Sequence, residues 1–448
     1  MQPTFNTESL IEQDIAHMFH PVTNLHRHRQ SGPLVLVSGN GVRVTDSSGK
    51  TYLDGFAGLW NVNVGHGRTE LADVARDQMA RLAFQPTFFG LATPPAIELS
   101  SKLASMLPQQ HFQFTSGGAE SNETALKIAR YYWALSGKPL KQKIISRRMA
   151  YHGIAMGALA ATGVSAYWQD FGALPSGFIH ITPPFDYRAN PGLSEADFIA
   201  HLVHDLEQTI EREGADSIAA MIGEPVQGAG GVVIPPENYW RAIAPVLKKH
   251  NILLIADEVI TGFGRTGELF AQTTYGFTAD IVSLAKGITS GYIPVGAVGI
   301  SSEIFECIST PDRMFMHGFT YSGHPAGCAV ALANIDIIER EKLPENAQNR
   351  GLQLLIGLKT LESHEHVGNV RGKGLMAFVE VVAEKALKTA YDAASGIGGK
   401  LQAATRKRGL ITRCSDVGIA IAPPLIISRA EVDEFVNIVA ESIHEVCV

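Results

Sequence analysis

Short apolar runs alternate with stretches of helical periodicity between about residues 60 and 330. The runs have the length and the branched side chains of buried strands, and the stretch 121–137 is typical of the helices between them. This alternation favours β-α-β units, so we predict an α/β fold with a mostly parallel sheet and helices on both faces. The runs are HFQFTS (111–116), KQKIIS (141–146), FIHIT (178–182), IAAMIGEPV (218–226), NILLIADEV (251–259), DIVSLAKG (280–287) and GAVGIS (296–301).

The two ends of the chain have a different pattern. Residues 39–54 alternate apolar and polar positions around Ser47-Ser48-Gly49, which predicts an antiparallel hairpin. Beyond residue 330 we expect helices at 331–343 and 349–361, strands within 367–382, a helix near 385–408 and short strands with APPLIIS (422–428). We therefore predict a large domain at 61–330 and a smaller α+β domain built from residues 1–60 and 331–448, with a cleft at their junction.

Composition narrows the class of protein. The 448 residues are 45% hydrophobic and 18% charged, which is globular, and the formal charge of −7 comes without the basic and aromatic clusters of nucleic-acid-binding proteins. Four scattered cysteines suggest neither disulfides nor zinc. No secretory signal and no apolar run of membrane-spanning length is visible, so we expect a cytoplasmic protein without nucleic-acid or membrane partners.

The sixteen histidines do not predict a metal site. His26 and His28 lie in a polar segment that lacks the spacing of helical metal ligands. We therefore expect no bound metal.

Two carboxylates, Asp257 and Glu258, follow the buried run at 252–256. Charged residues after a strand can simply mark the point where it reaches water. The carboxyl edge of a parallel sheet is also where ligands bind, so both interpretations stand on this stretch alone.

Gly117 and Gly118 separate the predicted strand at 111–116 from a strongly helical run that begins near Glu120. Glycines allow close approach of the backbone, and the free N–H groups of a helix N-terminus attract anions. The pattern matches neither dinucleotide nor nucleoside-triphosphate fingerprints, which favours the phosphate of a smaller molecule. A glycine-containing helix start that binds nothing is the alternative.

Lys286 follows a third apolar run. A lysine there is costly unless it is paired or bonded, and a lysine with a lowered pKa forms Schiff bases with carbonyl compounds. A strand end that reaches solvent is the simpler alternative. Pyridoxal 5′-phosphate needs three contacts in an enzyme: an anion-binding cradle for its phosphate, an aspartate for its ring nitrogen and a lysine for its aldehyde. The three segments described above could supply them.

The sequence resembles the class III, or ω-, aminotransferases of pyridoxal-phosphate fold type I over nearly its whole length. The resemblance implies a transaminase with ping-pong kinetics that moves an amino group from an ω-amino acid, diamine or simple amine to a keto acid, with pyruvate as the expected acceptor. The matching motifs occur in the family's order: YLDGFAGLWNVNVGHG (52–67), SGGAESNETALKIAR (116–130), YHG (151–153), EPVQGAGG (224–231), ADEVITGFGRTG (256–267), SLAKG (283–287), HGFTYSGHP (317–325), RGKGL (371–375) and APPLIIS.

Carried over by position, the resemblance implies two catalytic residues, Lys286 for the Schiff base and Asp257 for the pyridine nitrogen. The remaining cofactor contacts are expected from Gly117, Gly118, Ala119, Tyr151, His152, Glu224 and Val259, with Thr320 reaching the phosphate of the other subunit. The site would therefore be shared in a homodimer, and pairing of dimers into tetramers stays open. The substrate pocket would be lined by Trp60, Phe88, Phe89, Tyr151 and Arg413.

The family's members differ in reaction and acceptor, so alternatives stay open at this point. One is a 4-aminobutyrate- or ornithine-type aminotransferase that uses 2-oxoglutarate. Others are an aminomutase of the glutamate-1-semialdehyde type, a decarboxylase and a non-catalytic regulator that binds the cofactor. Two departures from the family pattern concern binding: Gly117 and Ala119 replace serines in the cradle, and Val22 stands where relatives that accept bulky amines carry a larger residue.

Overall fold

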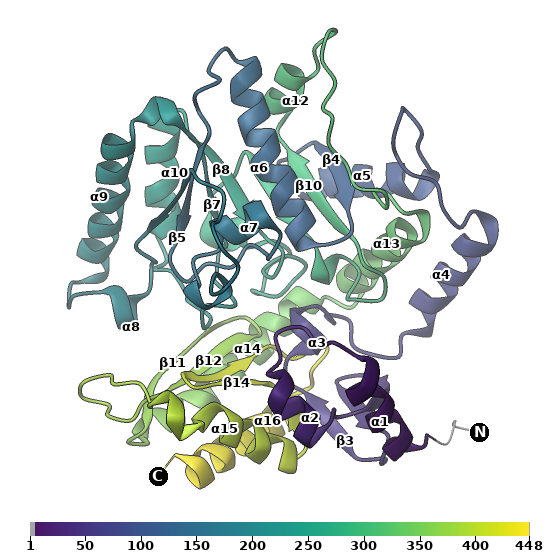
Figure 1. Ribbon diagram of the computed structural model, residues 1–448, viewed down its shortest axis with the longest axis vertical. Helices are drawn as coiled ribbons and strands as arrows, with labels where there is room; N and C mark the ends of the chain where they lie inside the picture. The colour runs from purple at the N-terminus through teal and green to yellow at the C-terminus, as the bar shows by residue number, and fades with distance from the viewer. Residues whose placement is uncertain (1–4, 448) are drawn as a thin grey trace.

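A seven-stranded sheet forms the centre of the larger layer in the computed structural model, which describes residues 5–447 (Figure 1). Five neighbouring strands are parallel, and β10 runs antiparallel to both β9 and β4, so the prediction of a mostly parallel sheet is confirmed. The spatial order is β4 (His111–Thr115), β10 (Gly296–Ile300), β9 (Ile281–Leu284), β8 (Leu253–Asp257), β7 (Ile218–Gly223), β5 (Lys143–Arg147) and β6 (Phe178–Ile181).

Helices cover both faces of this sheet, as its continuous apolar strands require. One face packs Ile255 and Ile281 against α6 (Gly118–Leu135), whose inward side carries Ala125 and Ala129. The opposite face buries Leu254 in the main core. The other helices of this layer are α4 (Thr69–Arg81), α5 (Pro94–Met106), α7 (Met156–Ala161), α8 (Asp186–Ala189), α9 (Glu195–Glu213), α10 (Tyr239–Lys249), α11 (Ala271–Tyr275), α12 (Ser302–Ile308) and α13 (Pro325–Arg340).

Segments from both chain ends form two smaller sheets beneath the large one (Figure 1). The first contains β1 (Leu36–Asn40), β2 (Arg43–Asp46) and β3 (Thr51–Asp54), joined in parallel by β13 (Leu410–Ile411) from the other end of the chain. The second is β11 (Val367–Lys373), β12 (Met376–Val381), β15 (Gly418–Ile421) and β14 (Arg413–Ser415). The helices of this layer are α1 (Thr7–His17), α2 (Leu25–Ser31), α3 (Ala57–Trp60), α14 (Leu343–Lys359), α15 (Ile397–Lys407) and α16 (Arg429–Val446).

The hairpin expected at 39–54 is present as β2 and β3, with β1 added at its edge. Residue 330 lies inside α13, so the predicted domain boundaries stay a prediction. No helix within residues 5–447 is long and apolar enough to cross a membrane.

Two expectations for the C-terminal part were wrong. The helix near 385–408 begins only at Ile397, because Ala383 and Thr389 close a turn through their backbone hydrogen bonds and Gly396 takes a left-handed conformation, with φ of 60°. The strand associated with APPLIIS ends at Ile421, before that motif. Pro423 and Pro424 have no N–H group to donate to a sheet.

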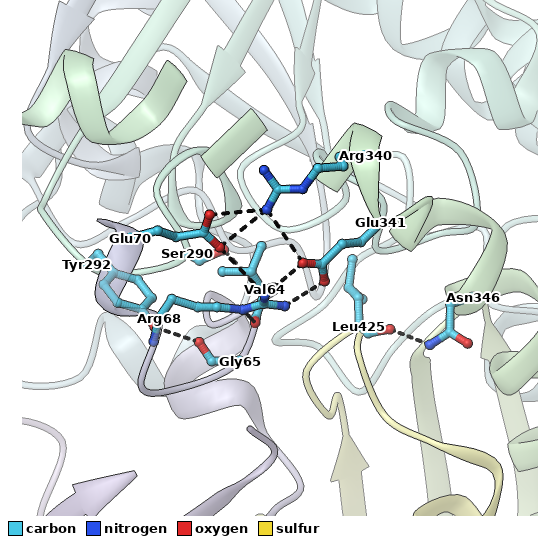
Figure 2. A network of polar contacts seen from close by, with 10 residues as sticks. All are labelled: Val64, Gly65, Arg68, Glu70, Ser290, Tyr292, Arg340, Glu341, Asn346 and Leu425. Atoms are coloured by element: carbon cyan, nitrogen blue, oxygen red, sulfur yellow. Dashed lines mark hydrogen bonds and ion pairs between the residues drawn. The ribbon is translucent and has the colours of Figure 1, made fainter. Parts of the chain in front are cut away.

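A polar network joins the start of α4 to the end of α13 (Figure 2). Arg68 donates to both carboxylate oxygens of Glu341, at 2.7 and 2.6 Å, and Arg340 pairs with Glu70 at 3.1 Å. The Tyr292 hydroxyl accepts the backbone N–H of Arg68 at 2.8 Å. Because Tyr292 follows Lys286 in the same connection, the network anchors that connection to the end of α13.

Replacing Arg68 by alanine should lower the free energy of unfolding by about 1–3 kcal/mol, since two charge-assisted hydrogen bonds are lost at a half-buried position. The measurement is the unfolding midpoint by differential scanning calorimetry. Arg76→Ala is the matched control, because Arg76 pairs with Asp73 and Asp77 on an exposed helix face and its loss should leave the midpoint unchanged. Equal midpoints for the two variants would contradict a role for this network in stability.

Candidate active site

The sequence-predicted residues that follow the strands of the large sheet converge at one sheet edge. Asp257 ends β8, Glu224 follows β7, Lys286 follows β9, and Tyr151 and His152 lie in the connection after β5. These side chains line a cavity of about 500 Å³. Its lining is Pro21, Val22, Leu59, Trp60, Gly118, Ala119, Asn122, Tyr151, His152, Gly153, Ile154, Tyr167, Glu224, Ala229, Asp257, Val259, Ile260, Lys286 and Arg413.

Asp257 is buried, and its carboxylate is held by three hydrogen-bond donors. Asn122 Nδ2 and His152 Nδ1 each lie 2.7 Å from Oδ2, and the backbone N–H of Val259 lies 3.1 Å from Oδ1. A carboxylate acceptor requires His152 to carry its proton on Nδ1. His152 Nε2 and Asn122 Oδ1 are buried without a partner among the described residues. The donors compensate the cost of burying the carboxylate and orient it toward the cavity.

Glu258, next to Asp257, caps a helix and does not line the cavity. Its side chain is fully buried and accepts the backbone N–H groups of Ala271 and Gln272, at 3.0 and 2.8 Å, at the start of α11. Burial raises the pKa of Glu258 to about 7. The two adjacent carboxylates therefore have different roles. Asp257 lines the cavity, and Glu258 accepts hydrogen bonds at a helix N-terminus.

Lys286 lines the cavity from the 3₁₀ turn Lys286–Ile288. Its φ of 49° is uncommon for a residue with a side chain, which marks a backbone held in place by its surroundings. Burial lowers the pKa of the Lys286 amine to about 8, although the negative charges of Asp257 and Glu224 oppose this shift. The neutral fraction of the amine near neutral pH is therefore much larger than that of an ordinary lysine.

Glu224 is buried beside these groups. Its carboxylate accepts the backbone N–H of Tyr151 at 2.9 Å and that of Gly228 at 2.8 Å. Burial raises its pKa, and the negative charge of Asp257 acts in the same direction. Glu224 thus fixes the connection that carries Tyr151, whose ring lies 5.2 Å from that of Tyr167.

The start of α6 opens onto the cavity without a side-chain cap. The helix begins at Gly118, two residues earlier than the expected start near Glu120. A Cβ at Gly118 would lie 2.7 Å from Cγ1 of Val259, so any larger residue would displace that cavity wall. Backbone N–H groups at Gly118 and Ala119 are therefore available to an anion, whereas Gly117 precedes the helix and is outside the lining.

Arg413 in β14 and Trp60 in α3 complete the cavity from the smaller layer. Arg413 is half-buried, and within residues 5–447 no carboxylate forms an ion pair with it. Phe88, Phe89 and Thr320 lie outside this cavity. Phe88 and Phe89 line a separate hollow of about 950 Å³ with residues 314–319, and the Phe89 side chain is 91% exposed.

The sequence analysis missed several residues of the cavity, among them Asn122 and Tyr167. Asn122 lies four positions after Gly118 on α6, so helical spacing could have placed it on the same face. Tyr167 comes from the short turn Ser165–Tyr167, and no local pattern brings that turn to the cavity.

Known proteins that are similar to this chain are aminotransferases. Residues 25–443 match the model of the family described as Aminotransferase class-III. The crystal structure of a thermostable (S)-enantioselective omega-transaminase from Thermomicrobium roseum is similar, with a TM-score of 0.99, 62% identity and coverage of 100% of both chains.

Curated relatives cover nearly the whole chain. Putrescine–pyruvate aminotransferase of Pseudomonas aeruginosa is 38% identical, over 96% of this chain and 94% of its own length. Diaminobutyrate–2-oxoglutarate transaminase of Halomonas elongata is 38% identical, over 98% of this chain and 96% of its own length. The chain therefore belongs to the class III aminotransferases, a family of pyridoxal-phosphate-dependent enzymes, and it is an aminotransferase.

Proposed function

We propose that this aminotransferase takes an amino group from an amine donor and transfers it to pyruvate, with pyridoxal 5′-phosphate bound in the cavity. The donor carries its amine on a terminal or non-α carbon, as in a diamine, an ω-amino acid or a simple amine. The observation that carries the proposal is one cavity that joins Lys286, Asp257 and Arg413, an arginine without a carboxylate partner in the described part of the chain. The pyruvate-using relative and the omega-transaminase structure support this choice.

The residues of the cavity fit this cofactor. The uncapped N–H groups at Gly118 and Ala119 suit its phosphate, and Asn122 Oδ1 and His152 Nε2 are buried in the lining without a partner among the described residues. Asp257 suits a protonated ring nitrogen, which an adjacent negative charge favours. Tyr151 and Val259 would cover the two ring faces. When bound, pyridoxal phosphate supplies an aldehyde that bonds amines and a conjugated ring that accepts electrons.

Lys286 has two tasks in this proposal. Its neutral amine would hold the cofactor through the aldehyde, and the same amine, once released, would serve as the base that removes a proton from the donor's carbon. With a pKa of about 8 the amine both accepts that proton and returns it near neutral pH. The same base would serve both halves of the reaction, and the first product would leave before the keto acid binds, with the amino group retained in the cavity, which predicts ping-pong kinetics.

Arg413 would bind the carboxylate of the keto acid. A guanidinium offers two parallel N–H donors that match a carboxylate, and burial strengthens the pair. Trp60 and Tyr151 provide the apolar walls that suit an amine without a carboxylate. The cavity therefore offers one site for two unlike substrates, as a two-stage transfer requires.

We further propose a homodimer with shared sites. Phe89, Met314 and Met316, which line the second hollow, expose 91%, 68% and 83% of their surface, a concentration of apolar side chains typical of interfaces. Phe88 lines the same hollow, and Thr320 lies in the same exposed segment. In the dimer, these residues would reach the cavity of the other chain.

A second candidate acceptor is 2-oxoglutarate, because the relative from Halomonas elongata is named for it. The cavity would have to bind a second carboxylate for this substrate. Arg413 is the one arginine in its lining, within the described residues, which favours the monocarboxylate pyruvate.

The lowered pKa of Lys286 predicts how the enzyme takes up its cofactor. Only a neutral amine attacks an aldehyde, so the rate at which cofactor-free enzyme gains visible absorption from pyridoxal phosphate should rise with pH through about 8. Stopped-flow absorbance across pH 6–10 measures this rate. Lys286→Ala should gain no such band at any pH. A midpoint near the ordinary lysine value, or a band in the variant, would refute the assignment.

Replacing Arg413 by alanine should raise the KM for pyruvate about 10- to 100-fold, which corresponds to the loss of a charge-assisted hydrogen-bonding pair. The KM for a carboxylate-free amine should change less than about twofold, because that substrate does not use the guanidinium. Arg413→Lys keeps the charge without the planar fork and should give an intermediate value. Steady-state kinetics with both substrates varied provide the test, and equal changes in the two KM values would mean that Arg413 is structural.

The shared-site dimer predicts complementation between two inactive variants. Lys286→Ala removes the base, and Thr320→Glu places a negative charge against the partner's cofactor phosphate. A heterodimer of the two contains one intact site, so mixed dimers should regain activity that neither parent has. Analytical ultracentrifugation verifies that mixed dimers of twice 48.2 kDa form. Mixed dimers without activity, or a monomeric enzyme, would disprove a shared site.

A further inference from the structure

The N-terminal helices α1 and α2 have a weak apolar anchor, because Leu10, Ile11 and Ile15 of α1 are only half-buried. Neither helix contains a buried residue. Helices of 11 and 7 residues are too short to be stable by themselves, so other contacts must hold them in place. Polar side chains between α1 and α2 therefore contribute to holding the two helices in place.

Asp14, His20 and His28 meet at this place. The Nε2 atom of His20 lies 2.7 Å from Oδ2 of Asp14, and the Nε2 atom of His28 lies 2.6 Å from Oδ1. The two rings are 4.3 Å apart, and the side chains of Asp14, His28 and His20 are 11%, 11% and 23% exposed. Three potential ligand atoms thus converge, one each from α1, the following connection and α2.

These atoms match the requirements of a transition-metal ion. All three lie within 4.8 Å of one another, and ligand atoms on one tetrahedral zinc ion lie about 3.4 Å apart, so small side-chain shifts suffice. The site therefore offers a carboxylate and two imidazoles, with a fourth position for water.

We propose that Asp14, His20 and His28 form a binding site for a divalent ion of the zinc class, and that the ion holds the N-terminal segment against the active-site cavity. The site consists of these three ligands alone, so it is independent of the proposed amine:pyruvate activity. Metal ligation in place of a hydrophobic core is a common way to fix a small segment.

The position of the ligands explains what the ion would control. Residues 18–24 connect α1 to α2, and within this connection Pro21 and Val22 line the cavity. His20 directly precedes Pro21, while Asp14 and His28 lie on either side of the connection. Val22 has a φ of 49°, a strained conformation for a β-branched residue that needs support from its surroundings. An ion at this place would fix part of the cavity wall.

Metal binding to the holoenzyme tests the site directly. After treatment with a chelator, wild-type enzyme should bind one Zn²⁺ per chain in a competition titration with a chromogenic chelator, and Co²⁺ should give the visible d–d bands of a tetrahedral site. His28→Gln and Asp14→Asn should weaken binding by at least about 100-fold, since each removes one of three ligands. His26→Gln is the matched control, because His26 lies exposed on the same helix outside the cluster. No stoichiometric binding, or equal binding by His28→Gln and wild type, would overturn the proposal.

Proteolysis tests the effect on the connection. Phe19 is 80% exposed, so chymotrypsin should cleave after it when the segment opens. Zn²⁺ at ten times its dissociation constant should slow this cleavage about 10-fold in wild type and in His26→Gln, and should have no effect in His28→Gln. Equal cleavage with and without Zn²⁺ in wild type would show that the direct hydrogen bonds alone hold the segment, and would overturn the proposed role of the ion.

Discussion

The burial of one carboxylate, Asp257, constrains the whole active-site edge of the large sheet. A carboxylate at this depth is tolerated only with hydrogen-bond donors aimed at it. The donors are Asn122 from α6, His152 from the connection after β5 and the backbone of Val259 after β8. Three separate segments must therefore reach one point. The same requirement places the start of α6 and Lys286 on the wall of the same cavity.

Burial and the nearby carboxylates act in opposite directions on the protonation of Lys286. Burial favours the neutral form of Lys286, whereas the nearby carboxylates favour the charged form, and burial prevails. The outcome is an amine that holds or releases a proton near neutral pH. Arg413 has no carboxylate partner within residues 5–447. One cation is thus available for proton transfer and another for substrate binding.

Sequence analysis anticipated the parts of the molecule that depend on local pattern. Continuous apolar runs such as 252–256 predict central strands because both faces are covered, and the hairpin around Ser47-Ser48-Gly49 follows from turn chemistry. The segment before Ile397 could not be predicted, since its helix-like composition is overridden by a local turn. Periodicity does not record how distant segments fold together. It therefore could not predict the position of Tyr167 in the cavity or the cluster of Asp14, His20 and His28. The metal-free expectation for His28 considered only spacing within one helix.

The most direct test of the proposed amine-to-pyruvate transfer is a half-reaction followed by absorbance. Single amines are added to the purified yellow holoenzyme, and the acceptor is then supplied separately. The account predicts that carboxylate-free amines or diamines bleach the visible band and that pyruvate restores it. Restoration by 2-oxoglutarate alone, or bleaching by α-amino acids alone, would contradict the account.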